Sequence, residues 1–136
     1  MNQRGRKSAA SLEVVEQSNV TELPRPSPPP ELSAEQAAEW NSVVARLPAD
    51  WFPRETHGLL AQYCRHVVAA RHVAQLISEM EQMDEIAIED YDRLLKMQER
   101  EGRALSSLAT RMRISQQSSF DKEKKKGAKV AKKPWE

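Results

Sequence analysis

Few side chains of this 136-residue chain could carry catalysis or bind a metal: it has three histidines and one cysteine. His66 and His72 stand six residues apart, which turns them to different sides of a helix, whereas facing pairs stand three or four apart. The single cysteine, Cys64, excludes an internal disulfide and a zinc site built from cysteines, and its simplest interpretation is a small buried group on a helix. We therefore expect no metal site and no cofactor.

The motifs of the common enzyme classes are also missing from the sequence. There is no G-x-x-x-x-G-K-[ST] phosphate loop, no H-E-x-x-H, no G-x-S-x-G and no G-x-G-x-x-G. Three acids lie close together at Glu89, Asp90 and Asp92, but spacing places no partner acid near them, so a solvated helix start explains them. The sequence predicts a protein that is not an enzyme, and binding is the chemistry that remains.

The charge of the chain is distributed unevenly, although its formal net charge is only +1. Residues 31–110 hold eight basic and fourteen acidic side chains, whereas residues 111–136 hold nine basic and three acidic ones. Lysine and arginine neutralise phosphates and release counterions, which gives sequence-independent affinity for DNA. We predict DNA contact through both basic ends of the chain, at Arg4, Arg6, Lys7, Arg111, Arg113, Lys122, Lys124, Lys125, Lys126, Lys129, Lys132 and Lys133.

Two other interpretations of the basic residues stay open. The lysine-rich end can be a solubilising segment, or it can meet the acidic surface of neighbouring copies of the chain. Arg65 and Arg71, with His66 and His72, form a mildly basic strip on a predicted helix, and an ordinary solvated helix face explains that strip equally well. Arg65 and Arg71 are the first residues to test if the end of the chain does not carry the DNA affinity.

The composition predicts three regions. Residues 1–31 are predicted to be a disordered arm, because their prolines remove backbone donors and favour extended structure, and because apolar side chains are few. Residues 32–115 are predicted to form a helical core and oligomerisation domain. Residues 116–136 have no hydrophobic periodicity and are predicted to be a disordered basic tail.

The first helix is predicted to begin at Ser33, because Ser33 and Gln36 match the capping-box spacing. Pro48 ends it. Trp51 and Phe52 follow in a short turn, where two large aromatic side chains are expected to fill the core between helices. The apolar face of this helix recurs at three- and four-residue spacing, at Ala37, Trp40, Val44 and Leu47.

Two long helices are predicted to follow, from about residue 55 to 82 and from about 88 to 113. A short connection between long helices favours an antiparallel hairpin, and Asp84 and Glu85 could cap the second of the two. The predicted fold is therefore all-α, a short N-terminal helix followed by a long antiparallel helical hairpin. The predicted seams are Leu60, Tyr63, Val67, Ala70, Ala74 and Ile77 on one helix, and Ile88, Tyr91, Leu95, Leu105, Ala109 and Met112 on the other.

Further apolar side chains lie beside these seams and need a second surface to cover them. We predict that a neighbouring subunit supplies it, so that the chain forms a homo-oligomer. No apolar stretch approaches the roughly 18 residues that a membrane-spanning helix needs, so a membrane is not expected as a partner. The predicted oligomer interface consists of Leu59, Val68, Leu76, Leu94 and Leu108.

Four stretches in this order carry a resemblance to a known family. They are G-R-K-S at 5–8, PPPELSAEQAAEWNSVV, LLAQYCRHVVAARHVAQLI and ALSSLATRMRISQQSS, and together they cover roughly residues 5–119. The pattern resembles the small subunits of tailed-phage terminases, the DNA-packaging proteins of these viruses. The chain departs from many of them in one respect, because residues 47–55 carry two prolines and bulky aromatics instead of the glycine turn of a helix-turn-helix.

The resemblance implies a function and a location. Small terminase subunits assemble as rings in the host bacterial cytoplasm, bind double-stranded viral DNA, and regulate the terminase large subunit, which carries the ATPase and the nuclease. The expected role is thus a non-catalytic DNA-binding adaptor for viral genome packaging. The alternative is a helical scaffold or regulatory protein that acts through protein–protein contacts without binding DNA directly.

Overall fold

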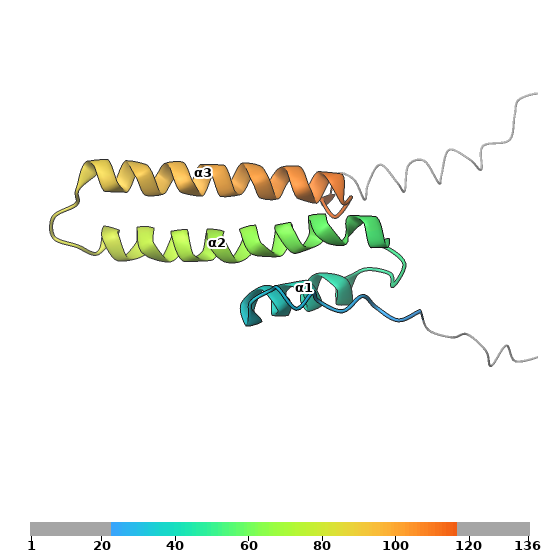
Figure 1. Ribbon diagram of the computed structural model, residues 1–136. Coiled ribbons are helices and arrows are strands. Elements are labelled where there is room, and N and C mark those ends of the chain that lie inside the picture. The colour runs from blue at the N-terminus through green and yellow to red at the C-terminus, as the bar shows by residue number, and fades with distance from the viewer. Residues whose placement is uncertain (1–22, 117–136) are drawn as a thin grey trace, which may run out of the picture.

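The computed structural model describes residues 23–116, and within this range the chain is all-helical, as the sequence predicts, with no strand. The elements are α1 (Ala34–Arg46), a short 3-10 helix η2 (Arg54–Thr56), α2 (His57–Glu81) and α3 (Ile88–Arg111). Figure 1 shows α2 and α3 side by side and running in opposite directions, with α1 beside only the first half of α2. No helix in this range is both long and apolar enough to cross a membrane.

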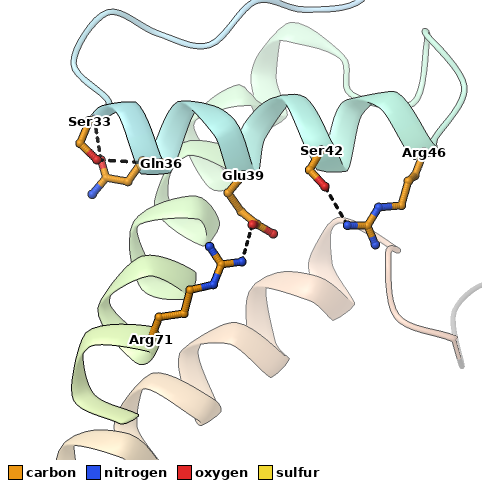
Figure 2. A network of polar contacts seen from close by, with 6 residues as sticks. All are labelled: Ser33, Gln36, Glu39, Ser42, Arg46 and Arg71. Atoms are coloured by element: carbon orange, nitrogen blue, oxygen red, sulfur yellow. Dashed lines mark hydrogen bonds and ion pairs between the residues drawn. The ribbon is translucent and has the colours of Figure 1, made fainter. Parts of the chain in front are cut away.

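Both ends of α1 are closed by side chains. At its N-terminus the hydroxyl of Ser33 accepts a hydrogen bond from the backbone N–H of Gln36 at 3.3 Å, and the Gln36 side chain accepts one from the Ser33 N–H at 3.0 Å (Figure 2). The capping box is confirmed. At the other end the Arg25 guanidinium donates to the carbonyls of Val44 and Leu47. Helix C-terminal carbonyls lack internal partners and attract cations, so Arg25 completes the helix.

The proline-rich segment before α1 has a definite place in the fold. Residues 23–31 contain neither helix nor strand, and they lead past α1 into Leu32, which is buried. The indole N–H of Trp40 donates to the Pro26 carbonyl at 2.9 Å. The prediction of disorder is therefore wrong for residues 23–31. Prolines have no backbone N–H, and this segment is instead held by the Trp40 bond to Pro26 and by the bonds from Arg25 to the end of α1. Residues 1–22, and the basic tail from residue 117, lie outside the described range.

The core lies where α1, the start of α2 and the end of α3 meet. Trp40, Leu60 and Cys64 are its fully buried side chains. The ring of Trp40 also meets that of His57 edge-on, with 5.6 Å between centroids. Phe52 is buried in this core, so the prediction that the aromatic turn fills it is confirmed. The other buried members of the cluster are Leu32, Val43, Val44, Ala61, Leu108 and Met112.

The buried faces of α2 and α3 differ from the predicted seams. On α2, Ala74 is exposed and Val68 is buried with only 4% of its surface accessible. On α3, Ile88 is 81% exposed, whereas Leu108 is 7% exposed and belongs to the core. The periodicity is helical as predicted, but α2 packs against two partners, and this sets a broader and rotated buried face. The observed buried residues of α2 are Leu60, Ala61, Cys64, Val68, Val73 and Ile77.

These positions correct two residues of the predicted oligomer interface. Val68 and Leu108 pack inside the subunit and are not free to face a neighbour. Leu59 is half-buried and packs against the core cluster, so it offers little surface. The three remaining interface residues with partial exposure are Leu59, Leu76 and Leu94.

The predicted cap of α3 also differs from the structure. The N-cap of α3 is Ala87, and neither Asp84 nor Glu85 provides a side-chain cap.

Candidate nucleic-acid interface

Neither the single cysteine nor the possible metal ligands of the described range form a reactive site. Burial raises the pKa of the Cys64 thiol to about 11, with a smaller contribution from the charge of Glu39. Because the thiolate is the nucleophilic form, Cys64 is an unreactive core residue at neutral pH, as its simplest interpretation predicted. Between residues 23 and 116 no group of three or more histidine, cysteine, aspartate or glutamate side chains could hold a metal ion.

The basic strip of α2 is engaged with acids of other segments. Arg71 donates from Nη2 to Glu39 Oε2 of α1 at 2.6 Å, as Figure 2 shows. Its neighbours pair in the same way: Arg65 with Glu31 at 3.6 Å, His72 with Glu35 at 3.3 Å, and His66 with Glu101 of α3 at 2.5 Å. The strip therefore links α2 to α1, to the segment before α1 and to α3. This arrangement makes Arg65 and Arg71 poor candidates for binding phosphate.

Several arginines that form no ion pair with an acid of the described range lie together at one end of the molecule, which we call the basic pole. Here α1 and α3 end and α2 begins (Figure 1). The residues that build this end are 23–26, 46–56 and 111–116, and within them five arginines stand against two acids, Asp50 and Glu55. The five arginines are Arg25, Arg46, Arg54, Arg111 and Arg113.

The turn between α1 and η2 fastens the basic pole to α3. The indole N–H of Trp51 donates to the Met112 carbonyl at 3.1 Å, at the C-cap of α3. A shallow groove of about 360 Å³ runs between the turn and this helix end, and both Arg111 and Arg113 line it. The two predicted DNA-binding residues in the described range thus lie together at the surface, next to an aromatic turn.

The backbone at Arg113 is unusual. Its φ is +58°, the left-handed conformation that favours glycine. This conformation closes α3: the Arg113 N–H donates to Thr110 O at 3.1 Å and the Ile114 N–H to Ala109 O at 3.0 Å. An arginine at a position that favours glycine carries a conformational cost. The Arg113 side chain is exposed beside the groove.

The opposite end of the molecule, the acidic tip, has the reverse charge. Residues 79–92 hold seven acids and no lysine or arginine. All seven are exposed: Glu79, Glu81, Asp84, Glu85, Glu89, Asp90 and Asp92. The charges of the body are therefore separated along the α2–α3 pair. A phosphate backbone that approaches the basic pole stays far from the seven acids of the tip, which would repel it.

Both boundaries of the described range lie at the basic pole. In Figure 1 the blue start and the orange end of the coloured ribbon both lie on the side of the molecule where α1 and α3 end, away from the acidic tip. The chain therefore continues from this pole toward both predicted basic segments. The remaining predicted DNA-binding residues lie outside the described range: Arg4, Arg6, Lys7, Lys122, Lys124, Lys125, Lys126, Lys129, Lys132 and Lys133.

Sequence reasoning missed three members of the basic pole. Arg25, Arg46 and Arg54 are far from Arg113 along the chain, and no motif or spacing connects them; only the packing of α1 against α2 brings them together. Comparison of the chain with protein-family models, with curated proteins and with solved structures finds no match to any of them.

Proposed function

We propose that the protein is a non-catalytic DNA-binding adaptor of the terminase small-subunit type, which brings double-stranded viral DNA to a large subunit. The resemblance in the order of sequence segments motivates this proposal. The observation that carries it is the separation of charge: five arginines at the basic pole, and seven exposed acids at the opposite tip. Nonspecific DNA affinity comes from cations that neutralise phosphates, and at the pole arginines outnumber acids by five to two.

The basic ends of the chain extend this surface in the proposal. Residues 117–136 add seven lysines beyond Gln116, and residues 1–22 add Arg4, Arg6 and Lys7. An oligomer presents several such segments to one duplex, and multivalency then raises affinity without a new type of contact. Binding of this kind reads the backbone more than the base sequence, in keeping with the turn at residues 47–55, which lacks the form of a helix-turn-helix.

We propose further that copies assemble through the half of the α2–α3 pair that α1 does not cover. Ile88 and Leu95, on one face of α3, are exposed apolar residues there, with 81 and 39% of their surfaces accessible. Covering them in a neighbour's contact would remove apolar surface from water. The resemblance favours a closed ring over a two-fold dimer, and assigns the ATPase and nuclease to the large subunit.

The test of the DNA proposal is the salt dependence of binding. In the full chain, the seven lysines between residues 122 and 133 are replaced by glutamine, and affinity for a B-DNA duplex is measured against salt. Each lost phosphate contact flattens the slope of log affinity against log salt by about 0.9, so losing four contacts would flatten it by about 3.6. Deletion of residues 120–136 should act in the same way, and should weaken binding to all sequences about equally.

Matched variants locate the rest of the interface. Arg111→Gln with Arg113→Gln should reduce the slope further, whereas Arg65→Gln with Arg71→Gln should leave it unchanged, because the latter arginines already face acids. An unchanged slope in the lysine variant, with a loss in the Arg65 and Arg71 variant, would contradict the assignment and place binding on α2.

A scaffold that acts only through protein contacts is the second candidate. The observation that favours it is the apolar surface on the distal half of the pair, where six of the seven exposed large hydrophobic residues of the described range lie. This candidate predicts an oligomer that shifts no duplex DNA even at low salt. Full-chain protein that shows no gel shift, while light scattering gives a mass several times 15.5 kDa, would select it.

A further inference from the structure

The distal half of the α2–α3 pair carries apolar surface that no part of the described range covers. Its exposed large hydrophobic residues are Leu76, Met83, Ile86, Ile88, Leu95 and Met97. Packing stabilises most helices in proteins, so exposed apolar surface on a two-helix segment marks a place where another element binds. Ile88 and Leu95, seven residues apart on one face of α3, belong to the proposed assembly surface, which leaves the side of the pair that holds Leu76 and Met83.

That side is hollowed into a groove of about 370 Å³. Four apolar side chains line it, and acids stand at its edge. Arg93 is the one basic residue in the lining, and its guanidinium is held by the Asp90 carboxylate at 3.1 Å. The groove therefore suits an apolar group with positive charge beside it. Its lining residues are Leu76, Glu79, Met80, Met83, Asp90, Arg93 and Leu94.

The C-terminal end of the chain has this chemistry. Lys129, Lys132 and Lys133 stand close before Trp135 near the C-terminus. Tryptophan has a large apolar ring system, and methionine and leucine side chains adapt to such a ring. The lysines would meet residues 79–92, where seven acids stand without a lysine or arginine. The groove and this segment thus match in both apolar character and charge.

The length of the tail permits the contact within one subunit. Leu94 and Arg111 are 17 residues apart on α3, a rise of about 26 Å along the helix. Trp135 lies 19 residues beyond Gln116, and such a segment spans at most about 63 Å. Lys129, 13 residues beyond Gln116, reaches at most about 43 Å. A short tether also gives a local concentration in the millimolar range, which favours contact within the same chain.

We propose that residues 129–135 of the same chain dock on the acidic tip, with Trp135 in the groove between Leu76, Met80, Met83 and Leu94. Lys129, Lys132 and Lys133 then face the acids of residues 79–92. The contact itself does not depend on the proposed function, but its consequence rests on that function. Lysines engaged at the tip are not free for phosphates, so DNA and the acidic tip compete for the same tail, and DNA binding uncovers the groove.

Carbodiimide cross-linking of the full chain tests the contact directly, because this reagent joins lysine to carboxylate without a spacer. An equal mixture of ¹⁴N and ¹⁵N protein is cross-linked at low salt, and the linked peptides are identified by mass spectrometry. We expect Lys129, Lys132 and Lys133 linked to Glu79 or Asp90, each pair within one isotope. The two proteins are unfolded and refolded together, so that any oligomer mixes isotopes. Tail links mainly to acids of residues 23–78 or 93–116, or mixed-isotope pairs as abundant as single-isotope pairs, would overturn the proposal.

Matched variants separate the apolar and the charged contributions. Trp135→Ser should reduce the links several-fold, whereas Trp135→Phe should retain most of them. Glu81→Gln with Asp84→Asn and Glu85→Gln should reduce the links to the unaltered Glu79 and Asp90. The control removes three exposed acids far from the tip, at Glu31, Glu35 and Glu55, and should leave these links unchanged. Equal effects of the two acid variants, or of the two Trp135 variants, would overturn the proposal.

DNA binding by the same variants gives the second measurement. The acid variant at the tip should bind duplex DNA several-fold more tightly than the unaltered chain, and deletion of residues 120–136 should abolish this gain, because the gain comes from release of the tail. If the links form as expected and no variant binds DNA, the docking stands and the proposed function fails. If DNA binds but the links are absent, the function stands and the docking fails. Leu76→Glu that dissociates the oligomer would make the groove a subunit interface and overturn the docking.

Discussion

The basic pole and the acidic tip are built from the same two long helices but differ in packing. At the pole α1, the aromatic turn and residues 23–32 cover α2 and α3, and all three fully buried side chains lie there: Trp40, Leu60 and Cys64. Toward the tip only Val73 and Ile77 of α2 are buried, and residues 81–90 are all exposed. The basic pole therefore supplies most of the stability of the fold, whereas the acidic tip leaves apolar and acidic surface free for partners.

Local opening should follow the same gradient. Regions with few buried apolar contacts and exposed helix backbone open at lower free energy than the global unfolding transition. Within the helical part of the chain, residues 34–111, amide exchange should therefore be fastest at residues 82–87, between α2 and α3, and slowest around Leu60 and Cys64. Substitutions of buried residues at the basic pole should therefore unfold the protein, whereas substitutions toward the acidic tip should leave it folded and weaken its contacts with partners.

The largest expected effect on stability comes from a charge placed in the core, compared with the same charge placed on the exposed surface toward the tip. Leu108→Glu puts a carboxylate into the core, where Leu108 is 7% exposed, and should destabilise the chain by more than about 4 kcal/mol. Leu95 is 39% exposed, so Leu95→Glu should change the free energy of unfolding by less than about 1 kcal/mol while reducing the mass of the assembly. Circular dichroism and light scattering distinguish the two. A folded, dissociated Leu108→Glu protein would restore Leu108 to the oligomer interface and contradict its burial.

A smaller effect is expected at the edge of the basic pole. Arg25→Gln removes the cation that donates to the carbonyls of Val44 and Leu47, and should cost about 1–2 kcal/mol of unfolding free energy. Arg54→Gln is the matched control, because it removes the same charge from an exposed position of η2 and should cost less than about 0.5 kcal/mol. Urea denaturation measures both. Equal stability of the two variants would mean that residues 23–31 contribute little to the fold of the pole.

The smallest effect tests the exposed face of α3 between the two regions. Gly102 lies inside the helix, and a Cβ added there meets nothing within 4 Å. Gly102→Ala should therefore raise the free energy of unfolding by about 0.5–1 kcal/mol, because alanine loses less backbone entropy in a helix. Gly58→Ala, in the first turn of α2, should give a smaller gain because helix ends fray. Thermal unfolding measures both gains. A destabilised Gly102→Ala protein would show that this face is packed against something, such as a neighbouring subunit.

Local sequence determined the elements themselves. Ser33 and Gln36 fix the start of α1, and Pro48 ends it close to where the helix stops at Arg46. The predicted helices at 55–82 and 88–113 match α2 and α3 within two residues at each end. The core role of Trp51 and Phe52 could also be predicted. These features depend on capping, proline geometry and hydrophobic period, each of which involves neighbours within a few residues.

The packing of elements against one another decided the rest. A continuous helix has apolar residues on adjoining faces, so periodicity alone did not choose Val68 and Leu108 for burial over Val67 and Leu95. The packing of α1 and α3 on α2 made that choice. The cap on α1 by Arg25, the pairing of Arg71 with Glu39 and the gathering of arginines at one pole all join residues distant in the chain. Such contacts depend on three-dimensional proximity, because charges and hydrogen bonds act over a few ångströms of space whatever the separation in sequence.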